Sequence, residues 1–184
     1  MSRDLCGRRS VLKTALGLGA AQLLPAQDNP AAARPQAGDL LIKAGDPALT
    51  PLTPSDIHSG AKQTLALVMD PESRIVRSGS RLNRILLVRL PAESLSTETK
   101  DRAAEGVVAY SALCSHAGCD VSDWLPEEQA LFCICHASKF LPADGAKVLD
   151  GPARKPLPAL PLKVTDGKLA VARPFTARVS FDQG

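Results

Sequence analysis

Two short runs of the chain each place one histidine beside two cysteines. The first is Cys114-Ser-His116-Ala-Gly-Cys119 and the second is Cys133-Ile-Cys135-His136-Ala-Ser138, with 16 residues between His116 and Cys133. Two cysteines and two histidines at these spacings can hold one compact metal centre between two loops, with Cys119 and Cys135 left over and close together. Thiolates and imidazoles bind zinc, copper and iron–sulfur centres, so the ligand types alone do not choose the metal.

The order C-x-H-x-G-C followed by C-x-C-H-x-S resembles the Rieske [2Fe–2S] family, in which two histidines replace two cysteines on one of the irons. The resemblance covers about residues 105–173. It implies one [2Fe–2S] cluster per chain, and it also implies a disulfide that links the two loops, as in Rieske proteins of the respiratory type. The implied cluster ligands are Cys114, His116, Cys133 and His136, and the implied disulfide joins Cys119 and Cys135.

Three further positions bear on the properties of such a cluster. Ser138 matches a hydroxyl that hydrogen-bonds a bridging sulfide in high-potential members. Phe140 stands where a tyrosine often donates to a ligand thiolate, and Ala117 stands where a leucine often shields the cluster. The resemblance therefore implies a redox potential between those of the respiratory and the oxygenase types. The run Gly151-Pro152-Ala153 resembles the start of the family's Pro-containing loop, although Arg154 replaces another common proline.

Two other readings of the motif stay open. Zinc binds sets of two cysteines and two histidines readily, although zinc fingers usually place the cysteines in one run and the histidines in another. A plain disulfide pair with incidental histidines is the second alternative. The third histidine, His58, has only Asp56 near it and is expected at the surface, and Trp124 is expected to pack beneath the first loop.

The N-terminus resembles a twin-arginine export signal. Arg8-Arg9-Ser10-Val11-Leu12-Lys13 precedes a mildly apolar stretch, and small-residue sites follow at 24–26 and at Ala31-Ala32-Ala33, which fits an A-x-A cleavage rule. We predict export to the periplasm, with residues 1–33 as signal and linker and residues 34–184 as the Rieske domain. Residues 11–24 are shorter than the roughly 20 apolar residues of a spanning helix, which favours cleavage over retention as an anchor. An ordinary amphipathic helix is the alternative.

Composition agrees with an exported electron carrier. Four of the five cysteines lie in the motif, and disulfides persist in oxidising compartments. The net charge is +3, and it falls to +1 without residues 1–33, which hold four basic and two acidic residues. Aromatic residues are 3% of the chain and no basic patch is interleaved with them, so nucleic-acid binding is not indicated. No nucleophile or general base stands out, which predicts an electron-transfer subunit and not an independent enzyme.

The chain is expected to be mainly β. Short apolar runs bounded by Pro and Gly predict strands, and Asp166-Gly167 predicts a hairpin. The expected strands are 40–42, 64–69, 85–90, 107–111, 130–132, 160–164 and 168–172, with one helix at 96–105, a linker at 26–38 and a solvated loop at 74–84. Together with the resemblance, this predicts an antiparallel Rieske-like β-sandwich with one short helix and the cluster-binding loops at one tip.

The expected function is periplasmic electron transfer as the small subunit or partner of a larger oxidoreductase, for example a molybdenum enzyme of the arsenite-oxidase type. The first alternative is the Rieske subunit of a quinol-oxidising cytochrome bc-type complex, which would receive electrons from quinol through cytochrome b. The second alternative is a zinc-binding interaction module without redox activity. The expected partner is thus a larger redox subunit or a cytochrome.

Overall fold

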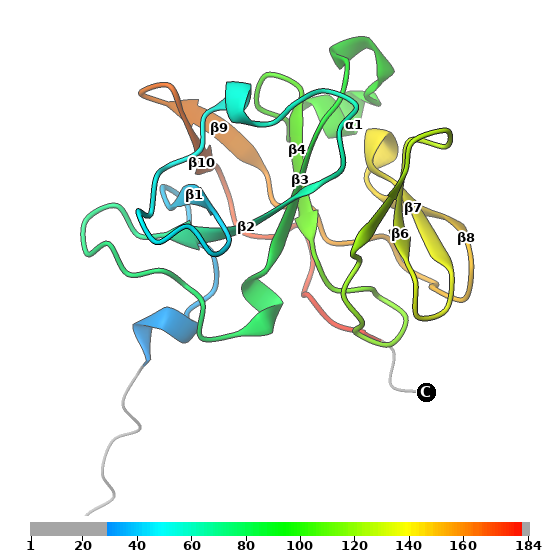
Figure 1. Ribbon diagram of the computed structural model, residues 1–184, viewed down its shortest axis with the longest axis horizontal. Coiled ribbons are helices and arrows are strands. Elements are labelled where there is room, and N and C mark those ends of the chain that lie inside the picture. The colour runs from blue at the N-terminus through cyan, green and yellow to red at the C-terminus, as the bar shows by residue number, and fades with distance from the viewer. Residues whose placement is uncertain (1–28, 182–184) are drawn as a thin grey trace, which may run out of the picture.

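The computed structural model describes residues 29–181, and the predicted twin-arginine motif, apolar stretch and site at 24–26 lie outside the described residues. The described chain forms two sheets in which every strand pairing is antiparallel (Figure 1). The larger sheet has the order β4 (Val107–Ser111), β3 (Ile85–Arg89), β2 (Thr64–Met69), β1 (Leu40–Lys43), β10 (Lys168–Val171), β9 (Leu162–Thr165). The smaller sheet has the order β5 (Asp123–Leu125), β6 (Ala130–Cys133), β7 (Ser138–Leu141), β8 (Lys147–Asp150). The predicted mainly β, antiparallel fold class is confirmed.

The alternation of side chains along β3 and β4 separates two hydrophobic cores. Leu86 and Tyr110 face the smaller sheet, whereas Leu87 and Ala109 face the opposite side of the larger sheet. This is the period of two that a strand imposes on its side chains. The core between the sheets also contains Leu131 and Phe140 and extends to the cysteines of both motif runs.

The predicted helix is much shorter than expected. The α-helix α1 spans only Thr97–Lys100, and the Ser96 hydroxyl caps it by accepting from the Thr99 N–H at 3.3 Å. The chain then turns back so that Ala104 and Val107 pair through two backbone hydrogen bonds. Gly106 makes this turn possible, because its φ is +80° and a Cβ there would lie 2.6 Å from the Leu90 carbonyl oxygen.

The other predicted strands hold to within two residues, but β5, β7 and β8 were not predicted. Strands β5 and β8 have only half-buried or exposed positions, and one of the two buried positions of β7 is a serine, so these short sequences carry little hydrophobic pattern. The predicted hairpin is confirmed, with Asp166 and Gly167 both at positive φ. The five 3₁₀ turns are Pro30–Ala32, Pro54–Asp56, Arg81–Asn83, Ala92–Ser94 and Pro142–Asp144.

The loop at 74–84 is not simply solvated, which corrects the sequence expectation. The Arg77 guanidinium is buried and donates to both carboxylate oxygens of buried Asp39, at 2.6 and 2.9 Å. Asn83 is also fully buried. Buried charges are tolerated when they are paired and hydrogen-bonded, so this ion pair holds the loop against the sheet.

The predicted linker at 26–38 is likewise docked on the body from Asn29 onward, as its hydrogen bonds to the loop show. Within residues 29–181, no helix has the length and apolar character that a membrane crossing requires.

Candidate metal centre

The first motif run follows directly from β4. The Val121 N–H donates to the Ala112 carbonyl at 2.9 Å, and the Cys114 N–H donates to the Cys119 carbonyl at 2.8 Å. The loop between them, here called cluster loop 1 (residues 112–121), closes through the Gly118 N–H, which donates to the Cys114 carbonyl at 3.0 Å. These ladder bonds fix where the Cys114 side chain points, which is into the core between the sheets.

The second motif run connects β6 to β7. Cys133 and Ser138 are register partners at the ends of these strands, so cluster loop 2 is the four-residue connection 134–137. Ala137 has φ +59°, a conformation that a short connection requires here. As a result Cys133 and Ser138 are buried at the strand ends, whereas His136 is exposed at the tip.

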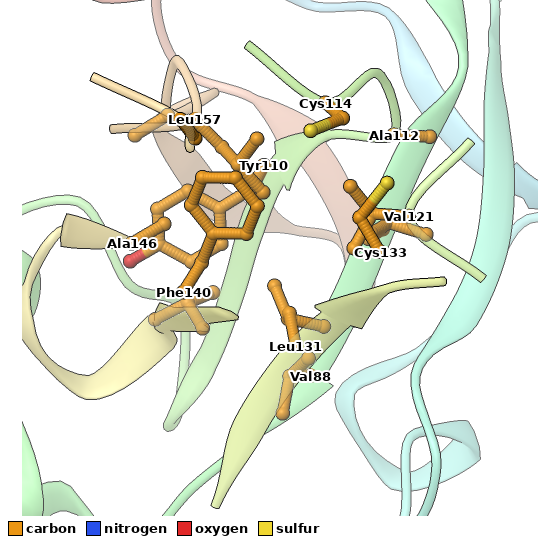
Figure 2. Packing of buried hydrophobic residues seen from close by; sticks show 14 of the residues in the cluster. Val88, Tyr110, Ala112, Cys114, Val121, Leu131, Cys133, Phe140, Ala146 and Leu157 are labelled. Atoms are coloured by element: carbon orange, nitrogen blue, oxygen red, sulfur yellow. The ribbon is translucent and has the colours of Figure 1, made fainter. Parts of the chain in front are cut away.

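The structure brings the two predicted cysteine ligands together in the core and the two predicted histidine ligands together nearer the surface, with His116 half-buried and His136 exposed. Cys114 and Cys133 are free thiols, 2% and 1% exposed, and belong to the same core (Figure 2). The rings of His116 and His136 lie edge to face, with centroids 4.7 Å apart. His116 Nδ1 is buried and has no hydrogen-bond partner. Buried polar atoms are otherwise paired, so an orphaned nitrogen on a loop that also carries a buried free thiol is expected of a metal-binding site.

The electrostatics of the thiols also fit a metal site. The pKa of the Cys133 thiol is raised to about 11, mainly by burial and also by the neighbouring Cys114 thiol, although the backbone N–H groups of Cys135 and His136 act in the opposite direction. Two buried thiolates side by side repel each other unless a cation lies between them. A metal centre supplies that positive charge, so the residues present fit the implied group.

The predicted disulfide between Cys119 and Cys135 is present, with the Cα atoms 6.6 Å apart. It joins cluster loop 1 to cluster loop 2. The sulfurs of Cys119, Cys133 and Cys135 all lie within 4.8 Å of one another. Because two of these three sulfurs are bonded to each other, the sulfurs left for ligation are those of Cys133 and Cys114.

The three residues predicted to tune or shield the cluster have different environments, and their effect on the cluster stays a prediction. Ser138 is fully buried, and its Oγ accepts from the Ala153 N–H at 3.2 Å, which leaves its own O–H to donate elsewhere. Phe140 is fully buried in the same core as the two thiols and Tyr110 (Figure 2). Ala117 is exposed at the tip and shields little.

A third segment, residues 150–157, closes over both cluster loops. Gly151 has φ +87°, and a Cβ there would lie 2.6 Å from the Ser138 Cα. Glycine is needed because the backbones pass so closely. The Ser115 hydroxyl donates to the Lys155 carbonyl at 2.6 Å, so this segment is tied to cluster loop 1 as well as to Ser138. The predicted role of Gly151-Pro152-Ala153 as a covering loop agrees with these contacts.

Other residues around the centre were not predicted. Arg81 donates to the Gly118 carbonyl at 2.9 Å, and Arg84 pairs with Asp120 at 2.7 Å. The Phe181 ring lies against Gly118, where a Cβ would come within 2.7 Å of it. In Figure 1 the red C-terminal segment runs beside cluster loop 1. None of these contacts has a signal in the sequence, because each joins residues far apart in the chain.

His58 and Trp124 were not predicted to belong to the metal centre. His58 is exposed, as predicted. Trp124 lies on β5 and packs against the core between the sheets, as expected of a packing residue, but its Nε1 is buried without a hydrogen-bond partner.

Two adjacent buried thiols and two adjacent imidazoles, on loops joined by a disulfide, are the side chains expected of a metalloprotein with mixed thiolate and imidazole ligation. A comparison with protein families matches residues 83–161 to the Rieske [2Fe–2S] domain. The chain thus carries a Rieske domain, and the cofactor of that domain is a [2Fe–2S] cluster. The assignment of its four ligands rests on the motif and on the placement of the side chains described above.

Curated relatives belong to the same class. The cytochrome bc1 complex Rieske iron–sulfur subunits of Streptomyces lividans and Streptomyces coelicolor are each 36% identical over 94 residues, which is 48% of this chain. The matched part is 53% of the first relative and 26% of the second. The chain therefore spans about half or less of the length of these relatives.

Solved structures with some likeness are also Rieske proteins or ferredoxins. The ferredoxin of carbazole 1,9a-dioxygenase from Nocardioides aromaticivorans has a TM-score of 0.43 and 20% identity, covering 73% of this chain and 98% of its own. The plasma membrane Rieske protein of Synechocystis PCC 6803 has a TM-score of 0.37 and 23% identity, covering 58% and 84%. The soluble domain of Rieske protein II from Sulfolobus acidocaldarius has a TM-score of 0.39 and 16% identity, covering 80% and 82%.

Proposed function

We propose that this protein transfers electrons as the iron–sulfur subunit or partner of a larger oxidoreductase. The observation that carries the proposal is the division of the ligand set, with two buried thiols and a pair of imidazoles of which that of His136 is exposed. A bound Rieske cluster takes up and releases one electron. The exposed His136 edge is the shortest route for that electron between the centre and a partner.

The surrounding residues keep the centre closed except at this edge. The disulfide holds the two cluster loops together, and segment 150–157 covers them through Ser138 and Ser115. Ser138 positions a hydroxyl beside the centre, where it stabilises added negative charge. The chain itself thus supplies anchoring, hydrogen bonding and water exclusion.

The tip is suited to a protein partner. Ile134, in cluster loop 2, is 61% exposed, and it lies beside exposed Ala137 and His136 in the chain. A single exposed apolar side chain costs the protein little stability, and its burial by a partner would favour docking at this tip. The proposed partner is a larger redox subunit or a cytochrome that approaches this tip.

A second candidate is the Rieske subunit of a quinol-oxidising cytochrome bc-type complex. The sequence likeness of this chain to the cytochrome bc1 complex Rieske iron–sulfur subunits of the two Streptomyces species favours it. In this case the donor is quinol, and the acceptor is a cytochrome of the same complex.

We further propose that the protein acts in the periplasm after twin-arginine export. The Arg8-Arg9 motif and the concentration of cysteines in a disulfide-bearing site support this compartment. An iron–sulfur cluster must be inserted before the protein crosses the membrane. Twin-arginine export suits this order, because it carries folded proteins.

A gene-replacement experiment separates the candidates. A strain without this protein is complemented with the wild type or with His136→Ala, and membrane and periplasmic fractions are assayed for reduction of cytochrome c. Quinol-dependent activity in membranes that only the wild type restores supports the bc-type subunit. Restoration of a substrate-dependent periplasmic activity instead supports the first candidate. Equal restoration of every activity by His136→Ala contradicts electron transfer through this centre.

A further inference from the structure

The A-x-A triplet at Ala31-Ala32-Ala33 lies in a docked segment of the folded body. The Ala31 carbonyl accepts from the Gly79 N–H at 2.8 Å, and the Ala33 carbonyl accepts from Asn83 Nδ2 at 2.7 Å. The triplet belongs to the 3₁₀ turn Pro30–Ala32 and the residue after it, and its three residues are half-buried. Residues 29–35 are here called the strap.

The anchors of the strap belong to the core of the molecule and not to a loose surface. Asn83 is fully buried, and its Nδ2 also donates to the Arg77 carbonyl at 3.1 Å. Arg77 is held by the buried ion pair with Asp39. The Arg34 side chain adds a bond from its Nη1 to the Leu82 carbonyl at 2.9 Å. Releasing the strap therefore strands a buried amide donor, which costs about 1–3 kcal/mol.

The strap also fits closely against the loop. Gly79 packs on it so tightly that a Cβ there would lie 2.9 Å from the Ala31 carbonyl carbon. The turn is held internally by Asn29, whose carbonyl accepts from the Ala32 N–H at 2.9 Å and whose side chain accepts from the Ala31 N–H at 3.1 Å.

Bound peptides are commonly recognised as extended strands through their backbone hydrogen bonds. Here Ala31 and Ala32 of the triplet lie in a 3₁₀ turn, which Ala33 leaves with φ −57° and ψ 147°. The carbonyls of Ala31 and Ala33 already have partners within the fold. A protease can reach it only after the strap detaches. If export follows folding, the triplet meets the processing enzyme in its docked form.

We propose that folding protects Ala31-Ala32-Ala33 from processing, so that the strap stays with the domain and any signal cleavage falls before Asn29. This inference rests on the proposed export. It differs from the sequence expectation that the signal ends at residue 33.

The docked state is tested first on purified, cluster-loaded protein, without export. Elastase, which cuts after small residues, is added, and cleavage at residues 31–33 is followed by mass spectrometry. Gly79→Ala should speed this cleavage roughly tenfold or more, since the added methyl pushes against the strap. Gly79 does not lie in the left-handed region, so alanine causes no backbone strain there. Ser78→Ala, the exposed neighbour, is the matched control and should match the wild type.

Arg34→Ala is a second variant for the case in which Gly79→Ala does not fold, because Arg34 is exposed and its loss removes only the contacts of the strap. Visible absorption of the cluster reports that each variant is folded. Wild-type cleavage at residues 31–33 as fast as in Gly79→Ala overturns the docked state.

Processing is then read from the N-terminus of the periplasmic protein by intact mass. A first residue at or before Asn29 supports the proposal, and a first residue at Arg34 overturns it. Protein found only in the cytoplasm, with the elastase result intact, contradicts the proposed export instead, so the two failures are distinguishable.

Discussion

Ser138 is the residue whose role the structure defines most sharply. Its Oγ accepts from the Ala153 N–H, so its proton is free to be donated toward the centre. A bond that strengthens on reduction by about 1.5–3 kcal/mol changes a one-electron potential by roughly 60–130 mV. Ser138→Ala should lower the potential of the cluster by an amount of this order, measured by protein-film voltammetry.

Phe140→Tyr should have the opposite effect on the potential. The ring is fully buried in the core that contains both thiols, and a hydroxyl at its end would have a thiolate sulfur as its acceptor. An unchanged potential in both variants would show that neither side chain faces the cluster sulfurs.

Cys133 gives a prediction for the protein without its cluster. Its thiol pKa is about 11 in the folded chain and 9.0 ordinarily, because burial disfavours the thiolate. A raised folded-state pKa means that stability is fully present below about pH 9 and is lost as the pH rises toward 11. Urea unfolding of cluster-free protein should show the free energy of unfolding falling across this window.

Cys133→Ser should make that fall shallower without abolishing it. Tyr110 contributes in the same direction, since burial also raises the pKa of its hydroxyl. The pH dependence must therefore be compared between the two proteins over the same range. Identical slopes for wild type and variant would contradict the burial of an ionisable thiol at this position.

At the scale of the elements, the disulfide links cluster loop 1 covalently to cluster loop 2. It closes a loop with a sequence separation of 16 residues, for which chain entropy predicts about 3 kcal/mol. The double variant Cys119→Ser/Cys135→Ser should lose about this much free energy of unfolding and should release iron faster, while a Rieske-type EPR signal is present at first. Reductant should reproduce the effect in the wild type and leave the double variant unchanged. Equal rates of iron release in all samples would contradict this role.

Segment 150–157 depends on Gly151. Gly151→Ala places a methyl group 2.6 Å from the Ser138 Cα, so the segment must move away from Ser138. Faster cluster loss is expected, together with a lowered potential because Ser138 loses its partner. Gly167→Ala is the matched control, because Gly167 also has positive φ but a Cβ there meets nothing within 4 Å. Both variants should lose similar stability from backbone strain, and only Gly151→Ala should change the cluster.

The secondary-structure elements differ in how well their sequences predict them. Apolar runs such as Thr64–Met69 and Val107–Ser111 were predicted with their observed bounds, because burial on both faces leaves a continuous hydrophobic signal. Strand β8 at Lys147–Asp150 was missed, since it is an edge strand with mostly exposed residues. The helix was overextended, because a capping serine and a following glycine also fit the tight turn at Gly106.

At the scale of the whole molecule, the sequence predicted where the metal centre lies, and the structure showed which distant residues hold the cluster loops in place. The motif spacing predicted the two cluster loops, because the residues of each run are close together in the sequence, and the resemblance to the Rieske family implied the disulfide between the loops. The buried ion pair of Arg77 with Asp39, the bond from Arg81 to Gly118 and the packing of Phe181 join distant segments. No local pattern encodes such contacts, so they became visible only in the folded chain.

The fold therefore encloses the metal centre and leaves it exposed mainly at His136. The two sheets bury the thiols of Cys114 and Cys133 in a shared core, and the loops pair the half-buried imidazole of His116 with the exposed imidazole of His136. A zinc site could use the same four side chains, so the nature of the metal decides between an electron carrier and an interaction module.

Iron, acid-labile sulfide and zinc analysis of the purified protein, combined with its EPR spectrum after reduction, tests this most directly. The expected result is two irons and two sulfides per chain with the EPR signal of a reduced Rieske cluster, and loss of all three on replacing any one of Cys114, His116, Cys133 or His136. One zinc per chain with no sulfide and no EPR signal would contradict the account.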